Sequence, residues 1–361
     1  MAVTEPAIPE THTAIIQHEG GVTKITPNLP LPKMEPGHIL VKTAAVALNP
    51  CDFKMPRRFP SPGTHNGCDW AGTVVALGDE VVQNGMFKIG DRVFAAVHGN
   101  NPADKDSGAY GEYLKAVAEF TWKIPDWMSF EEAAGLSGTC IATCCVALFR
   151  SLQLPGTFEE PAKKPVDVLI WGGASSIGTM AIQMVKLLGH RAITTCSPKN
   201  FDLVKSYGAD AVFDYNSPTC AEDIKKLTRN CLRYVLDPFG EVRTMALCDQ
   251  AMGRVGGRYT ALEKYQEIEE KKTIKRDMVM AAVIHGKGTT ALSDAWGKPA
   301  DDELHDWGVE CYKSIQRLVD AHKLRPHPIR VLDGRFDGIL EGLDMLRRKE
   351  ISAQKLVVRL D

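Results

Sequence analysis

The second half of the chain alternates short apolar runs with longer amphipathic segments. The apolar runs are Val166–Ile170, Arg191–Cys196, Ala211–Phe213, Tyr234–Leu236 and Arg258–Leu262. Short apolar runs separated by amphipathic segments predict strands that alternate with helices. This order is typical of a parallel sheet wound with helices on both faces.

The first part of the chain follows a different pattern, mostly of strands and turns. The predicted strands are His38–Leu48, Gly72–Gly78 and Asp91–Val97, the stretch Gly99–Gly111 is a loop, and Phe130–Gly135 and Thr139–Leu154 are helical. Pro, Gly and Lys gather in Pro155–Pro165, so we place the first domain boundary there. The tail offers a helix (Gly338–Lys349) and a last strand (Lys355–Leu360), which we expect to return to the first domain.

A glycine-rich turn joins the first strand of the second half to its first helix. Such a turn lets the backbone approach a phosphate closely, and the helix after it presents unpaired N–H groups at its positive dipole end. The order of strand, turn and helix therefore predicts a dinucleotide pyrophosphate site. Its residues are Gly172, Gly173, Ala174, Ser175, Ser176, Ile177 and Gly178.

The residues after the second strand of this unit indicate which dinucleotide binds. In NAD sites an Asp or Glu about 20 residues beyond the glycine turn binds the ribose 2′-hydroxyl. Here the strand ends in Cys196 and is followed by Ser197, Pro198, Lys199 and Asn200, without an acid. Ser and Asn side chains can bind a phosphate and Lys can pair with its charge, although the same residues also suit a solvated helix start. We predict NADPH.

Composition limits the class of protein. The 361 residues are enough for two domains, and a formal net charge of -2 gives no reason to expect nucleic acid or an anionic membrane as a partner. The N-terminus lacks the basic segment and apolar core of a secretory signal, and we expect no membrane-spanning run. The 10 cysteines form no Cys-x-x-Cys pair, so reduced thiols are expected. The sequence predicts a soluble, cytoplasmic protein.

Further motifs occur in register on both sides of the boundary: Gly90–Val93, Gly108–Tyr113, Ile124–Ala134 and Tyr207–Tyr215. Together with the glycine turn they resemble the medium-chain dehydrogenase/reductase superfamily over essentially the whole chain. The resemblance implies an α/β protein with a GroES-like, strand-rich catalytic and substrate domain over residues 1–158, completed by about 300–361. It implies an NADPH-binding Rossmann domain, a doubly wound parallel sheet, over residues 159–299.

The chain departs from the zinc alcohol dehydrogenases of this superfamily at the metal ligands. Cys51 stands at the first ligand position, but Cys68 and Asp69 replace the His–Glu pair, and Thr139 stands where the last cysteine would be. The stretch Asn100–Ala118 contains no cysteine, so the structural zinc loop is missing as well. Thiols and carboxylates do bind zinc, but this ligand set is incomplete, and we predict no metal.

Without zinc, the chain resembles the quinone and enoyl reductase branch, and within it the fungal trans-acting polyketide enoyl reductases. Asn49–Pro56, Gly138–Thr139, Cys196–Asn200 and Ile351–Val357 carry this likeness, with the glycine turn. The resemblance implies further cofactor contacts from Cys51, Asp52, Phe53, Lys54, Tyr215, Leu262, Glu263, Ser352 and Ala353. Substrate would be bordered by Cys140, Ile141, Ala142, Thr143, Cys144, Cys145, Val146 and Ala147, for which close helix packing is an equal alternative, and by Val283, Ile284, His285, Gly286 and Lys287.

The resemblance implies catalytic roles for Lys54 and Thr139. Hydride transfer to the β-carbon of an enoyl thioester leaves negative charge on the thioester oxygen, and the α-carbon then needs a proton. A positioned Lys54 ammonium can stabilise the enolate and donate the proton, or it can order the cofactor ribose; a solvated lysine is the alternative. Thr139 suits contact with the nicotinamide and equally a helix cap. Tyr215 suits stacking on adenine and equally covering the sheet edge.

The implied function is an NADPH-dependent enoyl reductase that acts in trans on a polyketide synthase, with a carrier-protein-bound enoyl thioester as substrate. Two alternatives are a free-standing NADPH quinone or enone reductase and a non-catalytic NADPH-binding interaction protein. Many relatives dimerise through a sheet edge, whereas the trans-acting reductases resemble monomers. A predicted strand at Met278–Ile284 would decide between these states.

Overall fold

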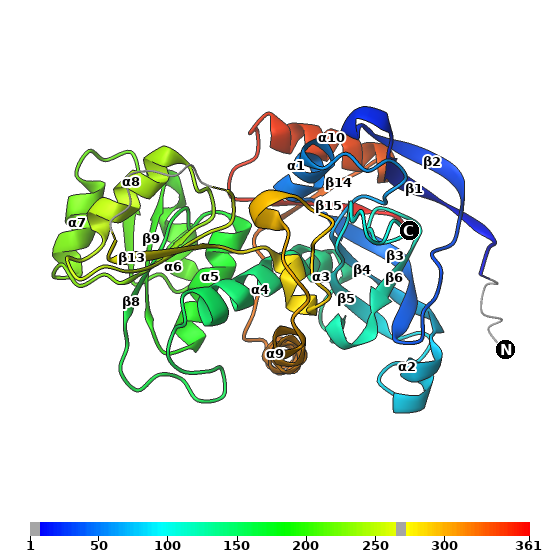
Figure 1. The fold of residues 1–361 in the computed structure, drawn as a ribbon, viewed down its shortest axis with the longest axis horizontal. Coiled ribbons are helices and arrows are strands. Elements are labelled where there is room, and N and C mark those ends of the chain that lie inside the picture. Colours follow the sequence, from blue (N-terminus) through cyan, green and yellow to red (C-terminus); the bar gives the residue numbers. More distant parts are fainter. Residues whose placement is uncertain (1–7, 265–271) are drawn as a thin grey trace. The chain divides into compact units, whose positions relative to one another are not determined.

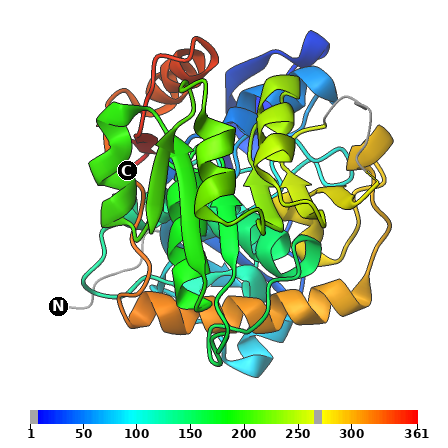
Figure 2. The same ribbon diagram turned by 90° about the vertical axis from the view of Figure 1, so that its left-hand side faces the viewer.

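Six parallel strands form the sheet that the alternating pattern predicts, in the order β10-β9-β8-β11-β12-β13. The fold is that of a computed structural model, which describes residues 8–264 and 272–361 (Figures 1 and 2). The strands are β8 (Asp167–Ile170), β9 (Arg191–Cys196), β10 (Ala211–Asp214), β11 (Tyr234–Asp237), β12 (Gly257–Ala261) and β13 (Ile274–Met278). This strand order is the Rossmann arrangement, in which the ligand binds where the strand order reverses, here between β8 and β11.

Helices connect these parallel strands. They are α5 (Ser176–Leu187), α6 (Phe201–Ser206), α7 (Cys220–Leu227) and α8 (Val242–Ala251). Ile224 of α7 and Met245 of α8 are fully buried in one cluster with Leu169, Ile193 and Val235 of the sheet. Burial of each such side chain contributes about 1.5–3 kcal/mol, so this apolar layer holds the helices on the sheet.

A second, largely antiparallel sheet has the order β14-β15-β3-β4-β5-β7, with β6 paired to β3. Its strands are β3 (His38–Ala47), β4 (Asp69–Leu77), β5 (Arg92–Ala96), β6 (Tyr113–Val117), β7 (Trp122–Lys123), β14 (Ile329–Leu332) and β15 (Lys355–Arg359), and β1 (Thr11–Gln17) with β2 (Thr23–Pro30) forms a separate ladder. The accompanying helices are α1 (Pro50–Arg58), α2 (Asp79–Asn84), α3 (Phe130–Leu136), α9 (Asp302–Asp320) and α10 (Arg335–Arg347). Because β15 pairs with β3, the predicted return of the tail to the first domain is confirmed.

The chain divides into two compact units. Unit 1 contains residues 1–139, 287–351 and 355–361, and unit 2 contains residues 140–286 and 352–354. The first division therefore falls inside α4 (Gly138–Cys145) and not at Pro155–Pro165, which lies within unit 2. Composition favoured the Pro-rich loop because it marks a break in secondary structure, but a helix can pass from one unit to the next without such a mark.

The predicted helix at Thr139–Leu154 is present as α4 followed by a π-helical segment, Val146–Ser151. By length and composition alone, the stretch Phe130–Ser151 is long and apolar enough to cross a membrane. This differs from the prediction that the chain contains no membrane-spanning run. However, 83% of its most apolar window is buried, and Ser137, with φ +65°, interrupts it between α3 and α4. These features are typical of core helices.

The prediction of a strand at Met278–Ile284 is wrong. β13 ends at Met278, and Ala281–His285 forms a short 3-10 helix that ends at Gly286 in the left-handed conformation, with φ +67°. A short apolar run does not distinguish a strand from a helical turn, and the glycine stop became visible only in the structure. Residues 1–7, on which the predicted absence of a secretory signal partly rests, lie outside the described residues, as do 265–271.

Candidate active site

The predicted pyrophosphate turn has the backbone that its glycines require. Gly172 has φ +70°, and a Cβ on Gly173 would lie 2.0 Å from Thr194 Oγ1. Helix α5 begins directly after the turn, where Ser175 is the N-cap and its hydroxyl accepts a hydrogen bond from Gly178 N–H at 3.0 Å. The first N–H groups of a helix have no acceptor within it. The turn and the start of α5 therefore offer donors to a phosphate and fit a nicotinamide dinucleotide.

The residues predicted to bind a 2′-phosphate follow β9. Pro198–Asn200 forms a 3-10 turn, Lys199 is exposed, and Asn200 donates a hydrogen bond to Ser197 Oγ at 3.2 Å. However, Asp214 ends the neighbouring strand β10 directly opposite Cys196, and its charge adds to burial in raising the pKa of the Cys196 thiol to about 11. The edge therefore holds an acid that inspection of the second strand alone missed.

Other residues at the carboxyl ends of the parallel strands include some that the sequence did not single out. Tyr215 follows β10, and Leu262 and Glu263 follow β12, all three half-buried. Phe239, after β11, is exposed, and a Cβ on Gly172 would lie 2.4 Å from its ring. Its backbone N–H donates to the buried Asp237 at 3.0 Å. The sequence signal for Phe239 is its position directly after a strand of the parallel sheet.

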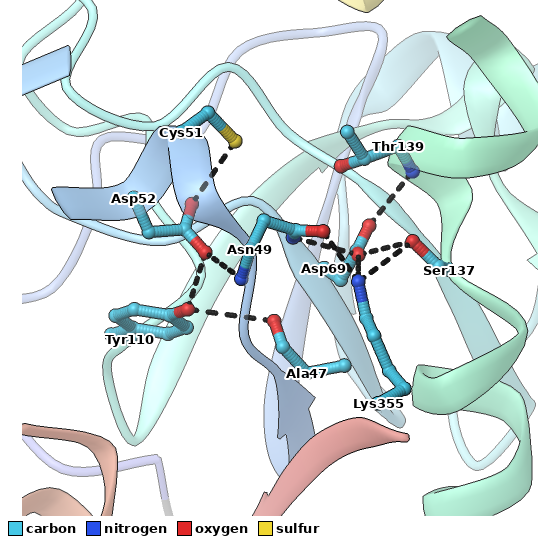
Figure 3. A network of polar contacts seen from close by, with 9 residues as sticks. All are labelled: Ala47, Asn49, Cys51, Asp52, Asp69, Tyr110, Ser137, Thr139 and Lys355. Carbon is cyan, nitrogen blue, oxygen red and sulfur yellow. Dashed lines mark hydrogen bonds and ion pairs between the residues drawn. The ribbon is translucent and has the colours of Figure 1, made fainter. Parts of the chain in front are cut away.

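In unit 1, helix α1 presents a buried carboxylate (Figure 3). Asn49 at the N-cap, Pro50 at the first helical position and Asp52 at the third are residues that favour a helix start. Asp52 Oδ2 accepts hydrogen bonds from Tyr110 O–H at 2.6 Å and Asn49 N–H at 2.8 Å. Burial raises the Asp52 pKa to about 6, although the Tyr110 hydrogen bond opposes this shift. The predicted cofactor residues Cys51, Asp52, Phe53 and Lys54 thus share one helix, with Lys54 half-buried.

Two thiols lie beside this carboxylate. Sγ of Cys51, Sγ of Cys68 and an Asp52 oxygen lie within 4.8 Å of one another, so one ion could reach all three. The hydrogen bond from Cys68 favours the Cys51 thiolate, but burial and the neighbouring carboxylates outweigh it and raise the Cys51 pKa. The Cys51 hydrogen bond and burial raise the Cys68 pKa still further. A bound metal ion would itself lower these pKa values, so the absence of a metal stays a prediction, and we derive no step through one.

The purified protein is therefore expected to contain well below one zinc per chain, as measured by elemental analysis. Prolonged dialysis against a chelator should leave its activity unchanged, because we predict no role for a metal ion. Stoichiometric zinc that dialysis removes together with the activity would contradict this expectation.

Thr139 lies at the start of α4, held by a second carboxylate. Its backbone N–H donates to Asp69 Oδ1 at 2.8 Å, and the Ser137 hydroxyl donates to the other oxygen of Asp69 (Figure 3). The Thr139 hydroxyl is buried and has no hydrogen-bond partner among the described residues. An unpaired buried hydroxyl is unfavourable, so this atom is suited to bind a polar group of a ligand. A helix-capping hydrogen bond, the alternative for Thr139, is not observed.

The remaining predicted residues are spread over the chain. Cys140, Ile141, Ala142, Thr143, Cys144, Cys145, Val146 and Ala147 are all buried in α4 and the π-helical segment. Val283, Ile284 and His285 lie in the 3-10 helix before Gly286, while Lys287 is exposed and begins the next segment of unit 1. Ser352 and Ala353 belong to unit 2, although the residues on either side of Ser352–Gln354 belong to unit 1. Roles in substrate or cofactor binding stay predictions for all of them.

Comparison with known proteins gives matches over the whole chain. Residues 35–126 match the alcohol dehydrogenase GroES-like domain and residues 176–300 the zinc-binding dehydrogenase model. The chain is 70% identical to Trans-enoyl reductase RAP1 of Pyricularia oryzae, covering 98% of this chain and 99% of that protein. It is 65% identical to Enoyl reductase cheB of Chaetomium globosum, covering 98% and 95%. An alcohol dehydrogenase superfamily protein from Novosphingobium aromaticivorans has the same fold, with a TM-score of 0.77 at 22% identity, covering 97% of this chain and 100% of that one.

Proposed function

The chain belongs to the trans-enoyl reductases of the medium-chain dehydrogenase/reductase superfamily, and from that premise we propose that it uses NADPH to reduce a polyketide enoyl thioester carried by an acyl-carrier protein. It is an oxidoreductase that acts on C=C bonds and takes a nicotinamide cofactor. The observation that carries the proposal is the high identity to two enoyl reductases along nearly the full length of both units. We further propose that it works in the cytoplasm, as a monomer.

The proposed chemistry assigns roles to the residues predicted to bind the cofactor and the substrate. When bound, NADPH supplies the hydride for the β-carbon of the substrate. The turn Gly172–Gly178 and the start of α5 bind the pyrophosphate, and Thr139 offers its unpaired hydroxyl to a polar group of the ligand. The Lys54 ammonium stabilises the enolate oxygen and provides the α-proton, or it orders the cofactor ribose. Asp52 and Tyr110 hold the start of α1, and with it Lys54, in place.

An acceptor panel tests the proposal. The purified protein is incubated with NADPH and with one of three acceptors: an enoyl thioester on a carrier protein, the same acyl group on pantetheine, or a quinone. Loss of NADPH absorbance should be fastest with the carrier-bound thioester. Faster turnover of the quinone would favour the free-standing reductase, and no turnover of any acceptor would favour the non-catalytic protein.

Cofactor choice is tested at Lys199. Replacing Lys199 with Asp is expected to lower NADPH affinity by about tenfold or more, because a charge-assisted hydrogen bond worth about 1.5–3 kcal/mol becomes a repulsion. NADH affinity should change little, so the ratio of NADPH to NADH affinity falls by the same factor. Dissociation constants for both nucleotides give the ratio, with Lys205→Asp on the exposed side of α6 as the matched control. An unchanged ratio in the Lys199 variant would overturn the assignment, and Asp214 would then be the residue to examine as a ribose acceptor.

A further inference from the structure

A buried ion pair lies at the centre of the network in unit 1. Lys355, the first residue of β15, places its ammonium 3.1 Å from Oδ2 of Asp69, the first residue of β4. The two side chains are 3% and 0% exposed. Removing both charges from water is costly, and such a pair is tolerated only where further hydrogen bonds satisfy it. The partners that supply those bonds therefore show what the pair is built to hold.

The partners come from segments that are far apart in the sequence (Figure 3). The Asn49 side chain donates to Asp69 Oδ2 at 2.9 Å, and its oxygen accepts from the Lys355 ammonium. The Ser137 hydroxyl donates to Asp69 and accepts from Lys355 at 3.2 Å. Thr139 N–H donates to the remaining Asp69 oxygen at 2.8 Å. The pair thus joins the residue before α1 to the residues that lead into α4.

We propose that Asp69 and Lys355 are positioning residues of the reductase, which set two predicted ligand-binding segments of unit 1 relative to one another. This inference rests on the proposed function, because it gives the pair its purpose there. The first segment is the start of α1, which carries Lys54, and the second is the start of α4, which carries Thr139.

Thr139 shows why position matters here. Its N–H is fixed by Asp69, while its hydroxyl is buried without a partner. The carboxylate therefore orients the residue without using its hydroxyl, which stays available to a ligand. Asn49 is used in a similar way: its side chain binds the ion pair, and its backbone N–H binds Asp52 in the first turn of α1. The Asp69–Lys355 pair and its partners therefore fix the starts of both α1 and α4.

A purely structural role makes a different prediction for a double variant. Lys355→Met leaves the Asp69 carboxylate buried and unpaired, which lowers stability whichever role is correct. Adding Asp69→Asn removes that uncompensated charge, so the melting temperature should recover towards that of the wild type. The hydrogen bonds from Lys355 to Asn49 and Ser137 stay lost in the double variant. Only a positioning role predicts that function does not recover together with stability.

The experiment measures the melting temperature, kcat and KM with an enoyl-pantetheine thioester, and the Kd of NADPH from the fluorescence of the bound nucleotide. For Lys355→Met and for the double variant we expect kcat/KM to fall by about tenfold to a hundredfold, the scale of a misplaced catalytic group. The control is Lys115→Met, which removes another buried lysine of unit 1, 5% exposed and paired with Glu35 and Asp104 at 3.0 Å. It should lower the melting temperature with kcat/KM within about twofold of wild type.

Joint recovery of melting temperature, kcat/KM and Kd in the double variant would overturn the inference, as would an equal loss of kcat/KM in Lys115→Met. If Lys355→Met does not fold, Ser137→Ala removes one hydroxyl from the pair without a charge, and it should show a smaller loss of kcat/KM. If the wild type reduces no enoyl thioester, the proposed function fails by itself. The Kd of NADPH in the double variant then decides the inference: a Kd equal to that of Lys115→Met overturns it, and a weaker one supports it.

Discussion

Replacing Lys54 with serine is expected to lower kcat/KM for an enoyl thioester by about a hundredfold, near the lower end of what general acid catalysis contributes. The enolate that hydride transfer produces carries negative charge on its thioester oxygen. A serine hydroxyl neither neutralises this charge nor donates a proton readily. Lys54 is half-buried on α1, close to the helix start that Asn49 and Asp52 stabilise. Steady-state kinetics with a carrier-bound or pantetheine thioester provide the measurement.

The same kinetics separate the two roles left open for Lys54. If Lys54 is a proton donor, its loss lowers kcat and leaves the KM for NADPH nearly unchanged. If Lys54 orders the cofactor, its loss raises that KM. Lys42→Ser, at an exposed position of β3, is the matched control and should keep wild-type kinetics. A folded Lys54→Ser protein with unchanged kcat/KM would remove Lys54 from the mechanism.

The second large effect is expected at the glycine turn. A Cβ on Gly178 would lie 2.5 Å from Gly172 O and 2.5 Å from Gly173 Cα, closer than real Cβ contacts. Both neighbours are backbone atoms, so Gly178→Ala can be accommodated only by moving α5 away from the turn. Overpacking of this kind costs about 1–3 kcal/mol. Because the turn and the start of α5 form the proposed pyrophosphate site, this strain should raise the NADPH Kd by about tenfold to a hundredfold.

Fluorescence titration with NADPH checks the Gly178 prediction. Gly37→Ala serves as control, because its Cβ would meet only the end of the flexible Glu80 side chain, at 3.2 Å. That variant should bind NADPH like the wild type. Wild-type affinity in Gly178→Ala would mean that the close contact of turn and helix is not needed for the cofactor.

The sequence predicted most elements of the fold because their signals are local. Strand β9 and the turn at Gly172–Gly178 follow from apolar runs and glycines that are adjacent in the chain. The secondary structure of Met278–Ile284 could not be predicted, because an apolar run is compatible with both a strand and a 3-10 helix. The limit between the units was missed for a similar reason, since α4 crosses it without a change in composition.

The candidate site was predictable in part. The residues of α1 and the glycine turn were found through motifs whose members are close in sequence. The Asp69–Lys355 pair joins residues 286 positions apart, and no local pattern indicates which buried lysine meets which carboxylate. Asp214 was missed because strand pairing, and not sequence spacing, brings it opposite Cys196.

The pairing of β15 with β3 also sets the order in which the chain can complete its parts during synthesis. Strand β3 is made before all the helices from α1 to α10, whereas β15 is made after them. All six strands of the Rossmann sheet, by contrast, are available once Met278 has been made. The sheet of the unit that comes second in the sequence can therefore be completed first, and residues 45–47 of β3 stay unpaired on one side until β15 has been made. Loss of β15 would thus leave part of an early strand without its partner.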